Sequence, residues 1–272
     1  MDATATESLA EKVAGDPERR ERLRARLRAF LIHFSISVAI FVVLMYLIIA
    51  HWYAGPYFRF DGGWRGTLIV IGVDLVLGPT LTLIIFDPRK AAWKIKLDLA
   101  FICLIQAAAL AWGFYAVESQ RPVALSFFNA GFHPITAQVI RGQDKNIEDL
   151  EQFHPQFPPL VFVEFPTDEA GRERMQNIWV EKGYSPHNQF QLLRPLKPHL
   201  EQIARQQPPV ERMAKVNKEF RAELDAFEEQ HGGSGEQFIY LPFNGRYGVV
   251  LFALDSEGRL VDYLTTAYKG IL

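Results

Sequence analysis

The sequence predicts a membrane protein with three transmembrane α-helices, followed by an exported α+β domain that contains an antiparallel sheet. Three observations predict this fold class. Before residue 118 the apolar residues form three long runs, each close to the roughly 20 residues of helix that cross a bilayer core. After residue 118 they form short runs broken by charge, proline and glycine. Lysine and arginine gather on one side of the three runs, which is typical of multi-pass membrane proteins.

The three runs define a transmembrane region over residues 30–117, with expected spans at 30–53, 67–86 and 98–117. The first run, "FLIHFSISVAIFVVLMYLIIAHWY", is too long for a cleaved signal peptide and lacks small residues before a cleavage site. We therefore interpret it as a retained anchor. Residues 1–29 form a basic leader, in which Asp16, Pro17 and Glu18 are typical of a helix start. We expect that helix to continue into the first span.

Charged residues next to the spans predict their orientation, because cytoplasmic flanks are enriched in lysine and arginine. The leader and the turn between the second and third spans hold most of them: Arg19, Arg20, Arg22, Arg24, Arg26, Arg28, Arg89, Lys90, Lys94 and Lys96. The turn between the first two spans offers only Arg59 and Arg65. We therefore expect a cytoplasmic amino terminus and residues 118–272 across the membrane. The leader arginines signal topology in this interpretation, and such residues also bind anionic lipid headgroups.

The exported domain, residues 118–272, has the size of one ordinary domain. Strand patterns are expected at 121–128, 133–140, 159–166, 236–243, 247–255 and 259–268. Helices are expected at 167–182 with Thr167 as its cap, at 197–206 and at 209–230. The last helix has an apolar stripe that we expect to face the core: Val210, Met213, Val216, Phe220, Leu224 and Phe227. Asn244-Gly245 predicts a hairpin turn, and hence a closing antiparallel meander.

The exported domain lacks the sequence patterns of catalytic and metal sites. Its histidines have no partners at ligand spacing, so we expect them at the surface: His133, His154, His187, His199 and His231. Ser234 lies in a polar "GGSGE" loop without the second glycine of a nucleophile elbow. No glycine-rich phosphate loop is present. We expect no enzymatic activity, no catalytic residue, no metal or other cofactor, and no nucleic-acid partner.

The second span contains a departure from plain hydropathy, "GVDLVLGP" at residues 72–79. Asp74 lies about 10 Å deep at 1.5 Å per residue, where a carboxylate needs a partner or a proton. On the third span, Gln106 and Trp112 are the nearest polar residues in depth. Two interpretations remain open. Asp74 either fixes the packing of the three helices, or faces a groove for the transmembrane helix of a partner.

The residues around Asp74 indicate a closely packed and irregular helix. Gly72 and Gly78 are small enough to allow close helix approach, although their spacing is not that of GxxxG. Pro79 removes the hydrogen bond to the carbonyl of Leu75, so we expect a kink there. Gly72, Asp74, Gly78, Pro79, Gln106 and Trp112 are therefore the candidate residues for helix packing or partner contact.

Three long ordered motifs follow one another in the sequence: "GPYFRFDGGW", "GVDLVLGPTLTLIIFDPRKAAWKIKLDLAFICLIQAAALAWG" and "RPVALSF". They resemble those of the type IV pilin accessory proteins of the TfpX/TfpZ family. The resemblance covers about residues 30–128 and implies an inner-membrane protein of a Gram-negative bacterium, with its carboxy-terminal domain in the periplasm. It also implies a chaperone-like role in the stability of a cognate pilin or its entry into the pilus. No functional residue is carried over from the family.

The partners that follow are a type IV major pilin, through its membrane helix and its periplasmic head, and membrane lipids. One alternative is a membrane-tethered periplasmic ligand-binding or sensor module, which would need a pocket with convergent polar groups in residues 118–272. Another is a membrane enzyme acting on lipid or glycan, which would need acidic residues converging in a cleft. The sequence leaves the choice of pilin and the stoichiometry open.

Overall fold

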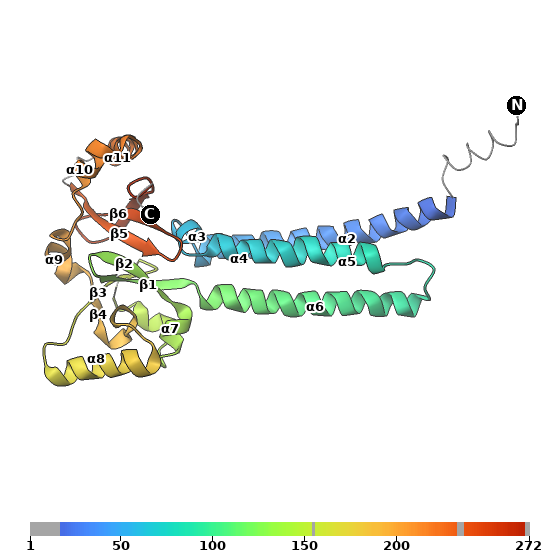
Figure 1. Ribbon diagram of the computed structural model, residues 1–272, viewed down its shortest axis with the longest axis horizontal. Coiled ribbons are helices and arrows are strands. Elements are labelled where there is room, and N and C mark those ends of the chain that lie inside the picture. Colours follow the sequence, from blue (N-terminus) through green and yellow to red (C-terminus); the bar gives the residue numbers. More distant parts are fainter. Residues whose placement is uncertain (1–16, 154–155, 233–236, 270–272) are drawn as a thin grey trace, which may run out of the picture. The chain divides into compact units, whose positions relative to one another are not determined.

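The computed structural model describes residues 17–153, 156–232 and 237–269, which form two compact units (Figure 1). The helical unit contains the described residues up to Leu47 together with Arg65–Ala116. The sheet unit contains Ile48–Trp64 and the described residues from Val117 onward. The proposed cap Asp16, His154 and Ser234 lie outside the described residues.

Three long helices account for the apolar runs. The first is α2 (Pro17–Leu47), continued by the π-helix η1 (Ile48–Trp52). The second consists of α4 (Gly63–Val70), the π-helix η2 (Ile71–Leu77) and α5 (Gly78–Ile85), and the third is α6 (Ala92–Ser119). All three are long and apolar enough to cross a membrane, by length and composition. The basic segment from Arg19 continues into the first span as one helix, which confirms that expectation.

The second span is irregular at the position that the proline predicts. The backbone N–H of Gly78 donates to the carbonyl of Val73, which closes a π-helical turn immediately before Pro79. Pro79 has no N–H to offer to Leu75, so the chain cannot continue the usual hydrogen-bond ladder through this point. The irregularity therefore takes the form of a widened helix over Ile71–Leu77, which contains Asp74.

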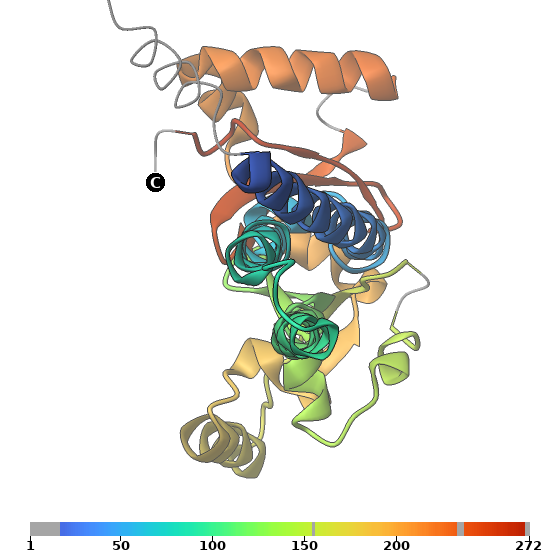
Figure 2. The same cartoon turned by 90° about the vertical axis from the view of Figure 1, so that its right-hand side faces the viewer.

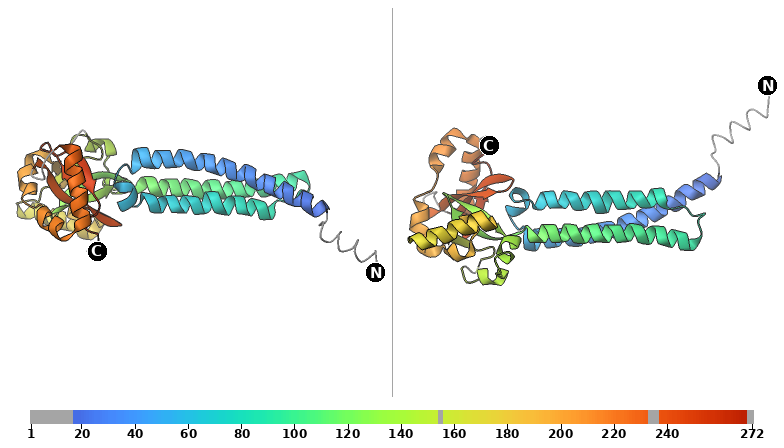
Figure 3. Two further views of the ribbon diagram at one scale, coloured as in Figure 1. Left: turned by 90° about the horizontal axis from the view of Figure 1, so that it is seen from above. Right: turned by 60° about the horizontal axis from the view of Figure 1, so that its bottom comes forward.

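Within the helical unit, α2 packs along α5 and η2, whereas α6 approaches the other helices less closely. Figure 2 looks nearly along these helices, with α2 in blue, α5 in teal and α6 in green. The two views in Figure 3 show the same three helices running alongside one another.

The sheet unit is built on a seven-stranded sheet in the order β4-β3-β1-β2-β5-β6-β7. The strands are β1 (Pro122–Phe128), β2 (Gly131–Thr136), β3 (Leu160–Val163), β4 (Leu193–Pro195), β5 (Ile239–Gly245), β6 (Gly248–Leu254) and β7 (Leu260–Leu264). The expected antiparallel sheet is wrong in part, because β1 pairs parallel with β3, and β2 pairs parallel with β5. Parallel neighbours require long crossovers, and the hairpin signals in the sequence report only local antiparallel pairs. The meander β5-β6-β7 is confirmed.

Helices and short 3-10 turns connect the strands. They are α3 (Tyr57–Phe60), α7 (Ala137–Arg141), η3 (Ile147–Leu150), α8 (Glu169–Lys182), η4 (Pro186–Asn188), η5 (Phe190–Leu192), η6 (Lys197–His199), α9 (Leu200–Ala204), α10 (Val210–Val216) and α11 (Lys218–His231). Alternate residues of each strand point to opposite faces of the sheet. On β1, for example, Leu125 and Phe127 pack into one core and Val123 into another.

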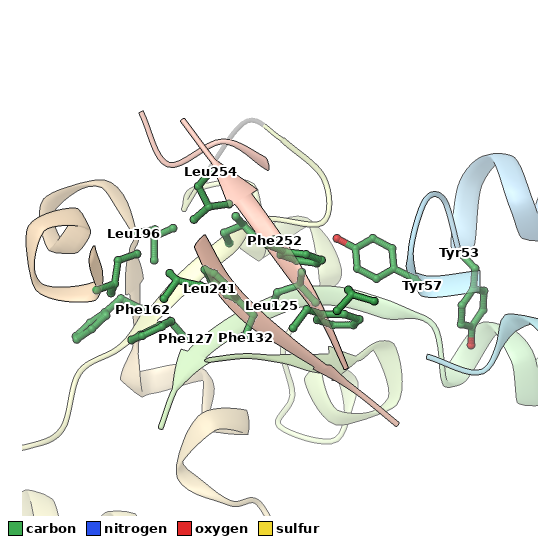
Figure 4. Packing of buried hydrophobic residues seen from close by; sticks show 14 of the residues in the cluster. Tyr53, Tyr57, Leu125, Phe127, Phe132, Phe162, Leu196, Leu241, Phe252 and Leu254 are labelled. Atoms are coloured by element: carbon green, nitrogen blue, oxygen red, sulfur yellow. The ribbon is translucent and has the colours of Figure 1, made fainter. Parts of the chain in front are cut away.

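One face of the sheet carries a continuous core that extends from β3 to β6 (Figure 4). This core includes Phe162, Leu125, Phe132, Leu241 and Phe252. The other face carries two separate clusters, one around β1, β3 and α7, and one around β5, β6 and α11. Each face is therefore covered, which a sheet with parallel pairs in its middle requires.

Two expected elements end or begin elsewhere. The strand expected at 133–140 ends at Thr136, whose side chain accepts from Val139 N and caps α7. Asp168, and not Thr167, caps α8 by accepting from Gly171 N. In both cases a short polar side chain satisfies a helix N–H that would otherwise be unpaired.

The helix expected at 209–230 is two helices, because Asn217 is extended and caps α11 by accepting from Phe220 N. The break rotates the apolar stripe, so Phe220 is fully buried while Val216 is 84% exposed. The hairpin turn between β5 and β6 is also displaced. Gly245 pairs with Gly248, which puts Arg246 and Tyr247 in the turn.

Candidate functional site

The helical unit contains a cleft of about 590 Å³ between α2, α6 and the second span. Its walls are apolar: Ala25, Ala29, Ile32, Ile36 and Ile40 from α2, Phe86, and Leu99, Cys103, Ala107 and Leu110 from α6. Arg28 also lines the cleft. The polar side chains in the lining are His33, Ser37, Asp74, Thr82 and Gln106. A polar group set among apolar walls is the usual composition of a recognition site.

Asp74 lies in this lining and is only 5% exposed. Its Oδ1 accepts from Gln106 Nε2 at 3.5 Å, the outer limit of a hydrogen bond. Its Oδ2 is buried and has no hydrogen-bond partner among the described residues. Of the two expected internal partners, Gln106 makes the contact and Trp112 is 69% exposed. Among the described residues, the carboxylate therefore has a hydrogen-bond partner for only one of its two oxygens.

Gly78 is the reason that Gln106 reaches Asp74. A Cβ placed on Gly78 would lie 1.7 Å from Gln106 Nε2, so only glycine leaves room for this amide. Pro79, the next residue, is buried in the first turn of α5. Gly72 differs, because a Cβ there would meet nothing within 4 Å. The structure thus brings together Asp74, Gly78 and Gln106 and leaves Gly72 and Trp112 apart from them.

His33 and Thr82 join the cleft, although the sequence analysis did not select them. Thr82 Oγ1 donates to the carbonyl of Gly78 at 3.2 Å and lies 2.6 Å from His33 Nδ1. A hydroxyl has one hydrogen, which Thr82 gives to the Gly78 carbonyl, so its oxygen accepts from His33 Nδ1. The available signals were the ionisable side chain in the first apolar run and a threonine one helical turn after Gly78.

A second buried aspartate lies in the sheet unit, within the motif "GPYFRFDGGW". The side chain of Asp61 has no exposed surface. Arg246 donates to its Oδ1 from the backbone N at 3.2 Å and from Nε at 3.1 Å, and to its Oδ2 from Nη2 at 3.3 Å. Arg246 also donates to Oε1 and to the carbonyl of Gln120, at 2.8 and 2.6 Å. Burial acts to raise the pKa of Asp61, and the hydrogen bonds and charge of Arg246 oppose it.

The loop that carries Asp61 is packed into the sheet core. Tyr57 contacts Phe243 edge to face at 5.6 Å between ring centres, and Figure 4 shows Tyr57 next to the core residues of the sheet, with Tyr53 farther out. Tyr247 N donates to the carbonyl of Phe60 at 2.9 Å. A Cβ on Gly245 would lie 2.4 Å from that carbonyl oxygen, so the hairpin needs glycine there. The loop over Ile48–Trp64 therefore folds as part of the sheet unit.

His133, His187 and His199 are partly buried and make ring contacts, which corrects the expectation of surface positions for these three. His133 and His187 are partly buried, with ring centres 5.3 Å apart. Burial and the neighbouring His133 lower the pKa of His187 to about 4, and burial lowers that of His133. His199 stacks on Phe162 at 4.0 Å. No group of three possible metal ligands gathers among the residues that the structure describes.

The helical unit contains three helices that are long and apolar enough to cross a membrane, which indicates membrane association, and the rest of the described chain forms the compact sheet unit. Residues 21–62, which include most of α2 and end just after Asp61, match the family described as fimbrial assembly protein FimB. A fimbrial assembly protein of Dichelobacter nodosus serogroups C1 and C2 is 34% identical over 90 residues, 33% of this chain and 69% of the relative. The chain belongs to the fimbrial assembly protein FimB family.

Two longer relatives from the same organism extend the comparison. The fimbrial assembly protein of serogroup I is 29% identical over 120 residues, 44% of this chain and 45% of the relative. That of serogroup E1 is 30% identical over 111 residues, 41% of each chain. The chain thus matches less than half of the length of these two relatives, and no solved structure matches it. The expected membership of a family of pilus (fimbrial) assembly proteins is confirmed at this level, and the narrower TfpX/TfpZ assignment stays a prediction.

Proposed function

We propose that this protein is a multi-pass inner-membrane accessory protein that assists a type IV major pilin before or during pilus assembly. Its amino terminus lies in the cytoplasm and its sheet unit in the periplasm. Membership of a fimbrial assembly family and three bilayer-length helices support this proposal. In this role the helical unit holds the membrane helix of the pilin and the sheet unit contacts its head.

The cleft around Asp74 is the observation that carries the proposal. Its lining on α2 runs from Ala25 to Ile40, which is about 22 Å of helix at 1.5 Å per residue. An occupant of that length within a bilayer is elongated, as a transmembrane helix is. Helices associate in lipid through close packing and polar contacts, because burying apolar surface gives no advantage there. The apolar walls of the cleft allow close packing, and the carboxylate of Asp74 offers a polar contact.

The sheet unit offers surface for a second contact. Trp179 and Val180 of α8 are 52% and 82% exposed, although both are large and apolar. Aromatic residues at a surface are frequent in protein interfaces. A pilin head held at α8 while its membrane helix occupies the cleft would be shielded from premature association, which is the chaperone-like part of the proposal.

Site-specific photocrosslinking from two positions on α6 tests the cleft. Ala107 lines the cleft, and Leu104, one turn earlier, is 67% exposed and does not line it. A benzophenone side chain at residue 107 is expected to give a pilin adduct in cells, and the same group at residue 104 little or none. Absence of an adduct from residue 107, with both variants intact in the membrane, would contradict the cleft as the pilin site.

Deletion of the gene tests the role itself, by measuring the pilin level and surface piliation. A drop in both is expected. A pocket of about 560 Å³ between α8 and the β3–β4 edge supports the alternative, a membrane-tethered ligand-binding module. Its charged lining residues are Glu164, Asp168, Arg174 and Arg194, of which Glu164 and Arg194 pair at 2.7 Å. Unchanged piliation after deletion would favour that alternative.

A further inference from the structure

We propose that the cleft is specific for a transmembrane helix that presents a nitrogen hydrogen-bond donor, an ammonium or amide N–H, to Asp74. This inference rests on the proposed function and names the chemistry by which the partner helix is chosen. It also gives a reason for a carboxylate that the protein's own fold leaves half satisfied.

The first step is the state of Asp74. Its Oδ2 is buried without a partner among the described residues, in a side chain that is 5% exposed. An unsatisfied polar atom in an apolar surrounding costs about 1–3 kcal/mol, and more when it is charged. Within a bilayer, no bulk water is present to offset that cost. An occupant that donates a hydrogen bond to Oδ2 therefore gains affinity that an apolar occupant lacks.

The second step is the direction of the neighbouring hydrogen bonds. The amide of Gln106 already donates to Asp74, and the hydroxyl of Thr82 already donates to the Gly78 carbonyl. His33 Nδ1 lies 2.6 Å from the Thr82 hydroxyl. Asp74 Oδ2 is thus an acceptor in the lining that has no partner among the described residues. A helix that carries an N–H at this depth supplies the complementary donor, and an ammonium adds a favourable charge.

The third step excludes other occupants. A lipid acyl chain or a wholly apolar helix has no hydrogen to donate, and leaves Asp74 as it is in the empty protein. A helix with a carboxylate at this depth adds a like charge close to Asp74, which is unfavourable in a low dielectric. A lipid with its anionic headgroup at Arg28, which also lines the cleft, is the competing occupant and is an outcome of the test below.

The test uses the full-length protein with a benzophenone side chain at residue 107, reconstituted in phosphatidylcholine vesicles. The partners are synthetic Leu/Ala transmembrane helices that differ in one central residue: Lys, Asn, Leu or Glu. The Lys and Asn peptides are expected to give about tenfold more adduct than the Leu peptide, equivalent to about 1.4 kcal/mol, and the Glu peptide the least. Equal yields from all four peptides would overturn the proposal.

Two variants assign the preference to Asp74. In Asp74→Leu the four peptides are expected to give equal yields. In Asp74→Asn the preference for Lys is expected to disappear while that for Asn is kept, because an amide oxygen still accepts. Asp98→Asn is the control, since Asp98 pairs with Lys90 and does not line the cleft, and it is expected to keep the wild-type order. A preference that survives in Asp74→Leu contradicts the proposal.

The results also separate this inference from the proposed function. A donor preference in vesicles without a pilin adduct in cells keeps the donor site and rejects the pilin as its occupant. A pilin adduct in cells without any donor preference in vesicles keeps the pilin as the occupant and rejects the donor site. Adducts to phospholipid at residue 107 that the Lys peptide does not displace would show a lipid site and reject the donor helix.

Discussion

Asp61 and Asp74 are both buried carboxylates, and they differ in what surrounds them. Asp61 accepts three hydrogen bonds from Arg246, inside the packed sheet unit. Asp74 accepts one long hydrogen bond from Gln106, inside a cleft of the helical unit, and its other oxygen has no partner in the part of the chain that the structure describes. A satisfied buried carboxylate holds a fold together, whereas an unsatisfied one is available to a ligand. The difference assigns a structural role to Asp61 and a recognition role to Asp74.

The largest expected effect on stability comes from breaking the pair between Asp61 and Arg246. Arg246→Ala leaves the Asp61 carboxyl buried without its partner, and breaking a buried pair in this way typically costs about 3–5 kcal/mol of unfolding free energy. Thermal unfolding of the purified full-length protein in detergent, followed by circular dichroism, measures it. The matched control is Arg194→Ala, because its pair with Glu164 is exposed and is expected to contribute less than about 1 kcal/mol. Equal shifts in the two variants would contradict a structural role for the buried pair.

A smaller effect is expected from two glycines of the second span. Gly78→Ala displaces the Gln106 amide, and overpacking of this kind costs about 1–3 kcal/mol. Gly72→Ala meets no neighbour within 4 Å and is expected to be neutral or slightly stabilising, because alanine is the better helix former. Denaturation in a graded detergent mixture compares the two variants. The adduct from residue 107 should fall only in Gly78→Ala, and the same loss in Gly72→Ala would count against the assigned geometry.

The smallest expected effect is a dependence of the stability of the sheet unit on pH. Burial and His133 lower the pKa of His187 from 6.5 to about 4, so the unfolded chain binds more protons between these values. Stability contributed by the neutral pair is complete above pH 6.5 and is lost as the pH falls toward 4, by about 1–2 kcal/mol after allowance for partial exposure. His187→Phe should flatten this dependence. An unchanged slope in that variant would show that other groups cause it.

The elements whose formation depends on residues close together in the sequence could be predicted from the sequence. The three long helices follow from apolar length, and β5, β6 and β7 follow from alternation and turn residues. The π-helical turn at Asp74 was predicted only as an irregularity. Pro79 shows where the regular backbone hydrogen bonds of the helix are interrupted, but it does not show which hydrogen bonds form instead. The break at Asn217 was missed, because the apolar stripe continues through a residue that is also a good helix cap.

Contacts between distant residues explain most of what the sequence could not show. Asp61 and Arg246 are 185 residues apart, and the sequence around either residue does not indicate that the other is its partner. The parallel pairs β1–β3 and β2–β5 likewise join strands that are separated by other elements. In the cleft, Gln106 was one of two candidate partners for Asp74, because depth in a bilayer restricts which residues can meet, and it is the one that lies within hydrogen-bond distance. His33 and Thr82 were missed, because each has an ordinary place on its own helix.

The recognition role of Asp74 is the central claim, and complementation of a deletion strain tests it most directly. Asp74→Leu and wild-type protein are expressed to equal levels, and membrane content and surface pili are both quantified. The predicted result is a wild-type amount of Asp74→Leu protein in the membrane with pili reduced about tenfold or more, the effect of losing roughly 1.4 kcal/mol of partner affinity. Full piliation by Asp74→Leu, or a loss of pili that merely follows a loss of the protein itself, would contradict the claim.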